Sequence, residues 1–275
     1  MLRKGDLTQG GITGTLLHFT LPMLVGSFLQ QCYNIADTLI VGQCIGAGAL
    51  AAVGSAYTLM VFLISVLLGL AMGSGTVFSL HYGAGNHVAL RRSIFSSFVL
   101  IGIVTLILNV AVFIWLDPIL RLLQVPQDIY GMMRSYLWII FCGIVFTFIY
   151  NFYASLLRAV GDSVTPLWFL AVSVVLNIAL DLFFILQLDW GIQGAAAATV
   201  LAQGVAALGI IIYTYRRRPE LRWHHEDMCF DRTCLKEIAS FSTLTCIQQS
   251  VMNLGILMVQ GLVNSFGTVV MAAFA

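Results

Sequence analysis

The chain of 275 residues carries very little charge. Only 9% of its residues are Asp, Glu, Lys or Arg, whereas 60% are apolar. A soluble domain is nearer to about a quarter charged, so this sequence cannot cover a globular surface with polar side chains. The lack of charge therefore indicates a protein whose solvent is mostly lipid. A backbone in lipid must satisfy its own hydrogen bonds, which leaves helix bundles and closed β-barrels.

The apolar stretches also lack the alternation that is typical of barrel strands. They continue for about twenty residues or more without alternating with polar ones, as membrane-spanning helices do. We therefore predict an all-α, multi-pass membrane protein. The predicted spans are 12–43, 50–80, 93–116, 129–157, 165–187, 190–215 and 237–265.

Motifs of nucleotide hydrolysis and of metal binding are absent as well. There is no GxxxxGK[ST] and no HExxH, and the six cysteines form no CxxC pair. One loop gathers possible zinc ligands, but their spacing suits zinc poorly. We therefore expect no enzymatic activity, no cofactor and no metal other than a coupling Na⁺. The residues of that loop are His224, His225, Cys229 and Cys234.

The basic residues predict the orientation of the chain. If the N-terminus lies in the cytoplasm, all thirteen Lys and Arg residues except Arg121 and Arg134 face inward. This is the bias of the positive-inside rule, and it explains the arginines without a nucleic-acid partner. The polar stretch 216–236 is predicted to be a solvated cytoplasmic linker. It separates a six-helix transmembrane domain at 1–215 from a further segment at 237–275.

Two acidic residues lie deep inside the apolar stretches. The chain has twelve Asp and Glu residues, and ten of them fall in loops or at the ends of predicted helices. The exceptions are Asp37 and Asp181. A charge at membrane depth costs roughly 2.5–3.5 kcal/mol on insertion scales, which is rarely accepted for packing alone. Both residues therefore mark a candidate functional site. The alternative is a structural polar pair that stabilises the bundle.

Helical geometry predicts further members of this site. At about 1.5 Å per residue, four polar side chains on four spans lie at one level, roughly 12–13 Å below the outer surface. They are Asp37, Tyr136, Asp181 and Thr199. Amides on the matching helix faces, or deeper in the bundle, are predicted to line the same cavity. They are Asn177, Gln30, Asn34 and Asn151.

The oxygen atoms of these side chains suit a small cation. Carboxylate, amide and hydroxyl oxygens are hard ligands, as Na⁺ requires. The same carboxylates could bind H⁺ instead, because desolvation and a second carboxylate nearby both favour the neutral form of a carboxyl group. Pro22 lies in the first half of the same span as Asp37, where it permits a bend.

Three sequence motifs resemble the multidrug and toxic compound extrusion (MATE) transporters. They are LHFTLPMLVGSFLQQCYNIADTLIVGQCIGAGALAAVG, the turn LLRAVGDSVTP, and the LNIALD that ends at Asp181. The resemblance covers essentially the whole chain. It implies an antiporter in a bacterial cytoplasmic membrane that exports amphipathic or cationic small molecules, drugs and other xenobiotics among them, in exchange for Na⁺ or H⁺.

The resemblance also implies roles for individual residues. Pro22 would allow the first helix to bend when the cation site is protonated. Met258 stands where a second Asp37 would align, so a single cation site is expected. That site would comprise Asp37, Asn177, Asp181 and Thr199, with Tyr136 and Asn151 nearby.

The family has two six-helix lobes, and this chain resembles only part of that arrangement. It carries the N-terminal lobe, followed by the first helix and the start of the next helix of a C-terminal lobe. The resemblance therefore implies a partial chain, whose transport path needs the remaining lobe.

Other interpretations stay open. A lipid-linked saccharide flippase of related architecture is expected to have more basic residues in its cavity, and here only Arg134 comes near the interior, from outside. An intramembrane enzyme would need a nucleophile with a base, and no histidine lies near the two aspartates. An inactive transporter fragment would keep the buried polar residues as relics.

Overall fold

The computed structural model describes residues 12–223 and 232–274, and all regular structure in these ranges is helical. This confirms the predicted all-α fold. The helices are α1 (Ile12–Cys44), α2 (Ala47–Gly83), α3 (His87–Leu122), α4 (Gln127–Cys142), α5 (Ile144–Ala159), α6 (Val164–Leu182), α7 (Gly191–Arg217), α8 (Arg232–Asn264) and α9 (Thr268–Phe274). A π-helical turn, Phe183–Gln187, extends α6, and a 3-10 turn, Pro219–Leu221, follows α7.

Most of these helices are suited to a membrane. In the described part of the chain, α2, α3, α6 with its π-helical turn, α7 and α8 are long and apolar enough to cross a bilayer. The pair α4 and α5 makes a sixth span if it is counted as one. These helices coincide with the predicted spans from the second to the seventh. α1 runs beside them for 33 residues.

The helix predicted at 129–157 is broken in the structure. α4 ends at Cys142, α5 begins at Ile144, and the two are bent by 49°. A Cβ atom on Gly143 would lie only 2.5 Å from Cγ2 of Val200 on α7. The close approach of α7 therefore requires glycine at this point. The predicted span is therefore present as two helices rather than as one continuous helix, and hydropathy alone does not register the break.

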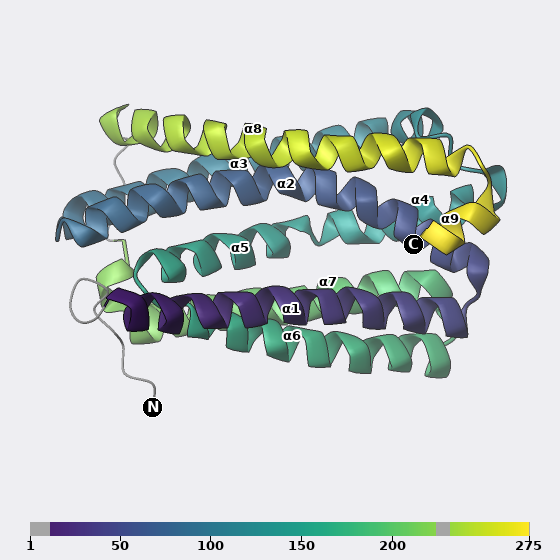
Figure 1. Cartoon of the computed structure of the whole chain (residues 1–275), viewed down its shortest axis with the longest axis horizontal. Helices are drawn as coiled ribbons and strands as arrows, with labels where there is room; N and C mark the ends of the chain where they lie inside the picture. Colours follow the sequence, from purple (N-terminus) through teal and green to yellow (C-terminus); the bar gives the residue numbers. More distant parts are fainter. Residues whose placement is uncertain (1–11, 224–231, 275) are drawn as a thin grey trace.

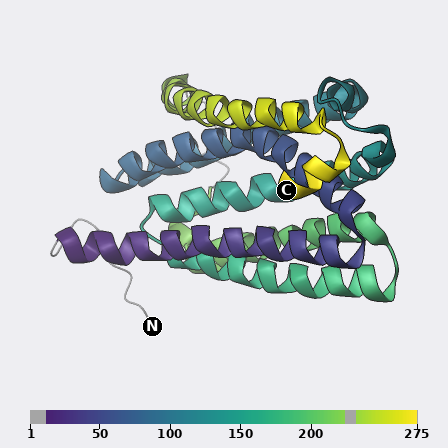
Figure 2. The ribbon, with the colours of Figure 1, turned by 45° about the vertical axis from the view of Figure 1, so that its right-hand side comes forward.

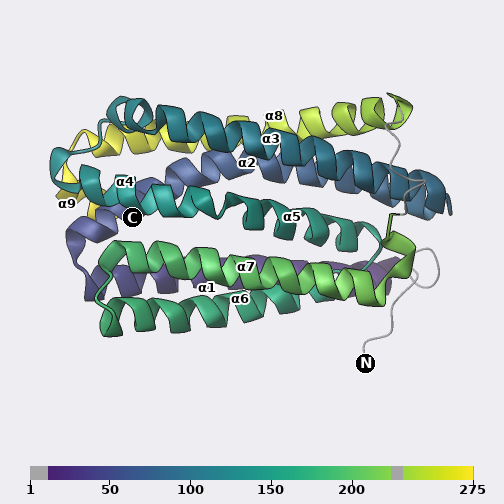
Figure 3. The same ribbon diagram turned by 180° about the vertical axis from the view of Figure 1, so that it is seen from behind.

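The helices form three tiers along one long axis (Figures 1 and 3). α2, α3 and α8 form the first tier, α4 and α5 the middle one, and α1, α6 and α7 the third. We call the end that holds the α2–α3 turn, the α5–α6 turn and the end of α7 the basic end, because most arginines lie there. The opposite end, the far end, holds the α1–α2 and α3–α4 turns. Figure 2 shows α1 and α2 meeting at the far end and separating toward the basic end.

α2 and α8 pack backbone against backbone. A Cβ atom on Gly69 would overlap the backbone of Cys246, and one on Gly73 would overlap the backbone of Ser242. Glycines allow such close approach between helices in lipid. Thr245 on α8 also donates a hydrogen bond to the Gly69 carbonyl at 2.7 Å. α8 is therefore an integral part of the described bundle.

The predicted solvated linker at 216–236 is packed against the bundle in part. Leu221 is 3% exposed, and the buried Arg218 forms ion pairs with Asp162 at 3.6 Å and with Glu220 at 3.2 Å. α8 already begins at Arg232, inside the predicted linker. The possible zinc ligands His224, His225 and Cys229, and the side chain of Cys234, lie outside the described residues.

Candidate functional site

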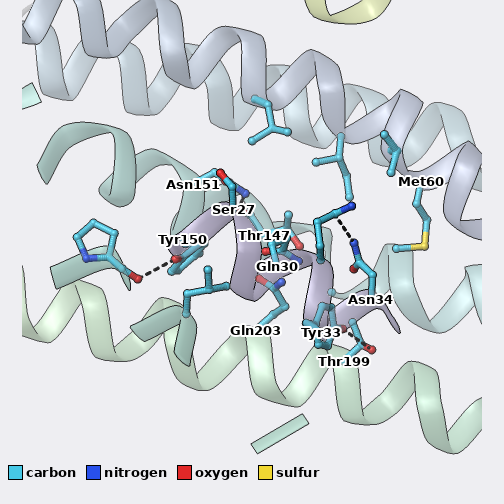
Figure 4. A pocket seen from close by; sticks show the side chains of 18 of the residues that line it. Ser27, Gln30, Tyr33, Asn34, Met60, Thr147, Tyr150, Asn151, Thr199 and Gln203 are labelled. Atoms are coloured by element: carbon cyan, nitrogen blue, oxygen red, sulfur yellow. Dashed lines mark hydrogen bonds between the residues drawn. The ribbon is translucent and has the colours of Figure 1, made fainter. Parts of the chain in front are cut away.

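A cavity of about 590 Å³ lies among α1, α2 and the helices from α4 to α7. Its volume is within the range of small-molecule sites, about 300–1,000 Å³. Figure 4 shows amide and hydroxyl side chains from several of these helices around it. Seven of the residues predicted from the sequence line this cavity: Pro22, Gln30, Asn34, Asp37, Tyr136, Asn151 and Thr199.

The two predicted carboxylates meet at one side of the cavity. Asp37 on α1 is 8% exposed and lines the cavity, whereas Asp181 on α6 is 0% exposed and is not part of the lining. The two carboxyl groups lie close enough together to interact electrostatically. Among the described residues, the Oδ1 atom of each is buried without a hydrogen-bond partner. Neither oxygen therefore has its hydrogen-bonding capacity used by the described part of the protein.

An amide and two hydroxyl groups complete this group of side chains. Asn177, with its amide nitrogen toward Asp181, donates to Oδ2 at 2.9 Å and accepts from the backbone N–H of Thr199 at 3.2 Å. The hydroxyl oxygens of Thr199 and Tyr33 lie 3.3 Å apart (Figure 4). We call Asp37, Asn177, Asp181, Thr199 and Tyr33 the carboxylate cluster. It joins α1 to α6 and α7.

Tyr136 reaches the same region from α4. It is buried, and it lies close enough to Tyr33 and the two carboxylates to interact with them electrostatically. Among the residues that the structure describes, it makes no hydrogen bond to the carboxylate cluster. Tyr136 therefore contributes to the wall of the site rather than to its hydrogen-bond network.

The predicted amides occupy the cavity wall away from Asp181. Asn34 donates to the Tyr57 hydroxyl at 3.0 Å, and Asn151 donates to the Thr147 carbonyl at 2.8 Å. Gln30 lies between them along the cavity (Figure 4). In both bonds the side-chain nitrogen is the donor, so the side-chain oxygens of Asn34 and Asn151 take no part in them.

Pro22 lies inside α1, which continues through it as a helix. One turn earlier, the Phe19 carbonyl accepts a hydrogen bond from Ser163 at 2.9 Å. Ser163 belongs to the turn between α5 and α6, so this bond attaches α1 to the rest of the bundle at the basic end. The proposed bending role of Pro22 stays a prediction.

Several polar residues that line the cavity were not predicted from the sequence, Tyr33 and Gln203 among them. Tyr33 lies four residues before Asp37, and Gln203 lies four residues after Thr199. Both therefore share a helix face with a residue that had been identified. The same spacing rule could have found them.

Two arginines, Arg134 and Arg158, lie elsewhere relative to the cavity than the sequence predicted. Arg134, which was expected near the interior, has a side chain that is 48% exposed and pairs with Asp117 at 2.8 Å. Arg158, which was assigned to the cytoplasmic surface, lines the cavity instead. The residue lies at the end of its helix, where hydropathy alone does not say which way a side chain points.

The family model MatE matches residues 22–183, which include Pro22, Asp37, Asn177 and Asp181. The chain is 32% identical to the probable multidrug resistance protein YpnP of Bacillus subtilis, over 99% of this chain and 61% of that protein. It is 30% identical to the probable multidrug resistance protein YoeA of the same organism, over 93% of this chain and 57% of that protein. The chain thus spans about 60% of the length of these relatives.

The fold is also that of a solved transporter. A multidrug resistance MATE family transporter in an outward-facing conformation superimposes with a TM-score of 0.84 at 24% identity. The superposition covers 90% of this chain and 55% of the transporter. At this identity the likeness establishes the fold alone.

Proposed function

Since the chain belongs to the MatE family, we propose that it carries the coupling site of an antiporter for Na⁺ or H⁺. In exchange, the antiporter would export amphipathic or cationic small molecules, drugs and other xenobiotics among them. The observation that carries the proposal is the carboxylate cluster at the wall of a small-molecule cavity. Two relatives that are named as probable multidrug resistance proteins support the class of cargo.

The chemistry of the carboxylate cluster supports a cation as its ligand. Among the described residues, no Lys or Arg forms an ion pair with Asp37 or Asp181. Two buried carboxylates without a counter-charge are costly in a membrane, and a bound Na⁺ or a shared proton offsets that cost. The unpartnered Oδ1 atoms are the oxygens that would receive the ion.

The position of Asp37 supports an exchange of cation and cargo. Asp37 belongs to the carboxylate cluster and also lines the cavity. A cationic cargo and the coupling ion would therefore compete for the same carboxylate. When binding of one lowers the affinity for the other, the ion gradient can drive release of the cargo.

We propose that the basic end of the bundle faces the cytoplasm. Arg91, Arg92, Arg158, Arg217 and Arg218 lie at that end, as the positive-inside rule requires for a cytoplasmic face. The protein would then reside in a bacterial cytoplasmic membrane. A C-terminal lobe, as in the longer relatives, would complete the transport path, with no nucleic acid or cofactor involved.

Removing either carboxylate tests the coupling site. Efflux of a cationic dye from everted vesicles is measured with a Na⁺ gradient alone and with a H⁺ gradient alone. Both the chain itself and the chain extended with the C-terminal lobe of a relative are assayed. Asp37→Asn and Asp181→Asn are each expected to lower gradient-driven efflux by at least about tenfold, which corresponds to about 1.4 kcal/mol. Unchanged efflux in both variants would disprove the coupling role.

The matched control for this test is Asp117→Asn. Asp117 is a carboxylate in the exposed ion pair with Arg134, outside the cavity. Its removal is expected to leave efflux unchanged. If the extended chain transports and the shorter one does not, the second lobe is required. If neither transports the dye, the proposed export function is wrong.

One observation keeps a second candidate function open. Arg158 lines the cavity, and a basic cavity is the expected mark of a lipid-linked saccharide flippase. A flippase would carry its lipid across the membrane regardless of the two aspartates. Retention of saccharide-lipid translocation in Asp37→Asn, together with no dye efflux by the unaltered protein, would favour this alternative.

A further inference from the structure

The cavity has a charged group at each of two ends. Arg158 lies in the last turn of α5, on the helix face that also carries Thr147 and Asn151, and all three line the cavity. The turn after α5 contacts α1 near Phe19 through Ser163. Asp37 is eighteen residues farther along α1, which is about 27 Å at the rise of an α-helix. The acid and the base therefore lie far apart along the cavity.

Arg158 has no anionic partner in the described part of the chain. Asp162, one turn away, pairs instead with Arg218 at 3.6 Å. Its two carboxylate oxygens also accept hydrogen bonds from the backbone N–H and the hydroxyl of Thr165, at 3.0 and 2.9 Å. Tyr150 is an electrostatic neighbour of Arg158, and its hydroxyl donates to the Pro166 carbonyl at 3.0 Å. The guanidinium is thus half-buried without a counter-charge.

Three other arginines in the described part of the chain differ from Arg158. Arg134 pairs with Asp117, and Arg218 pairs with Asp162. Arg217 is exposed at the basic end and does not line the cavity. Among the described residues that line the cavity, Arg158 is the only base and Asp37 the only acid. A guanidinium that is withdrawn from water without a partner is costly unless a ligand supplies one.

We propose that Arg158 is an oxyanion subsite of the cavity, and that the cargo carries an acidic group apart from its cationic part. The inference rests on the proposed function, since it describes the cargo of the same cavity. A guanidinium offers several N–H donors in a planar fork that fits a carboxylate, sulfonate or phosphate with two hydrogen bonds. Asp37 at the other end would receive the cationic part of a cargo that is long enough to reach both ends. The preferred cargo is then zwitterionic.

Two dyes that differ by one group test the Arg158 end of the cavity alone, because their charged groups lie too close together to reach Asp37 as well. Rhodamine 110 has a free carboxylate, and rhodamine 123 is its methyl ester, which is cationic with the same ring system. Binding of each to the purified chain is measured by fluorescence polarisation in maltoside micelles, which contain no phosphate. Arg158→Gln is expected to weaken rhodamine 110 binding about tenfold and to change rhodamine 123 binding by less than about twofold.

Two further variants separate the effect of the fork from that of charge alone. Arg158→Lys keeps the charge but not the planar fork, and we expect rhodamine 110 to bind it with intermediate affinity. Arg217→Gln removes an exposed arginine at the same end of the bundle and is expected to alter neither dye. Equal weakening of both dyes by Arg158→Gln would show that Arg158 only supports the cavity, and would overturn the subsite.

The remaining outcomes also decide the proposal. If Arg158→Gln leaves rhodamine 110 unaffected while the unaltered chain binds both dyes, the subsite is wrong and the proposed function stands. If the unaltered chain binds neither dye, the cargo assigned in both proposals is wrong. The source of the oxyanion is tested by repeating the titrations in phospholipid nanodiscs. Loss of rhodamine 110 binding there, restored in micelles, would assign Arg158 to a lipid phosphate and overturn the cargo assignment.

Discussion

α1 and α2 follow each other in the sequence and are of similar length, yet they are held in different ways. α2 has buried residues along most of its length, from Ala49 to Phe78. In α1, the only buried side chains among those described are Asp37 and Val41. α2 is therefore fixed by packing along its length, whereas α1 is fixed mainly at its far half.

The polar contacts of the two helices differ in the same way. α1 is attached to α6 and α7 by the carboxylate cluster, to α2 by the Asn34–Tyr57 hydrogen bond, and to the α5–α6 turn by the Ser163–Phe19 hydrogen bond. Large apolar side chains such as Leu21, Leu24 and Phe28 are exposed between them. Changing the charge state of the carboxylate cluster would thus alter what holds α1 while leaving α2 in place. The proposed coupling site thus lies on the helix that has the fewer buried packing contacts of the two.

α2 has a second kind of attachment, a buried polar network with α8 at the far end. The Asn264 amide donates to the Leu123 carbonyl at 2.9 Å and to the Ser55 hydroxyl at 3.1 Å, and its oxygen accepts from Gln260 at 2.9 Å. Thr58 donates to the oxygen of Gln260 at 3.2 Å. This network and the glycine contacts hold α2 to α8 at both ends.

The largest expected effect comes from widening the contact between α2 and α8. Gly73→Ala places a methyl group against the backbone of Ser242, which cannot rotate away as a side chain could. We expect a loss of about 3 kcal/mol, at the upper end of the cost of overpacking. The measurement is the thermal midpoint of the purified protein in detergent.

Gly255→Ala on α8 is the matched control for Gly73→Ala. A Cβ atom there meets nothing within 4 Å. Alanine also has the higher helix propensity, so the thermal midpoint is expected to stay the same or to rise. If Gly73→Ala also leaves the midpoint unchanged, α2 is not held more tightly than α1, and the comparison fails.

A smaller effect is expected at the polar network. Asn264→Ala leaves the Leu123 carbonyl, the Ser55 hydroxyl and the Gln260 amide without their partner in a buried place. We expect a loss of about 2 kcal/mol, seen as a lower thermal midpoint. Ser265→Ala, which removes an exposed hydroxyl one residue away, is expected to change little. Equal thermal midpoints for the two variants would show that the buried polar network does not stabilise the protein.

Much of this arrangement could be predicted from the sequence, for a physical reason. A bilayer fixes the length and polarity of a span, so apolar runs gave the approximate positions of the helices. The rise of a helix is constant, so counting residues placed Asp37, Asp181 and Thr199 at one level. In the structure these residues do lie together. Their role in binding a cation stays a prediction.

The parts that could not be predicted depend on contacts between distant segments. At the break between α4 and α5, Gly143 meets Val200, which follows much later in the chain. The close packing of α2 on α8 depends on which glycines face Ser242 and Cys246, and hydropathy carries no such information. The direction of Arg158 is likewise set by the tertiary arrangement. Local patterns give the depth of a residue but not the neighbour that it meets.

The smallest expected effect concerns the attachment of α1 at the basic end. Ser163→Ala removes the hydrogen bond to the Phe19 carbonyl, which is worth about 1 kcal/mol. Because few other buried contacts hold this half of α1, its backbone amides are expected to exchange with deuterium several-fold faster, while those of α2 do not change. Ser27→Ala is the control, since Ser27 bonds only to Met23 within α1. Equal acceleration in α1 and α2 would mean that the two helices move as one body, and that the carboxylate cluster cannot displace α1 alone.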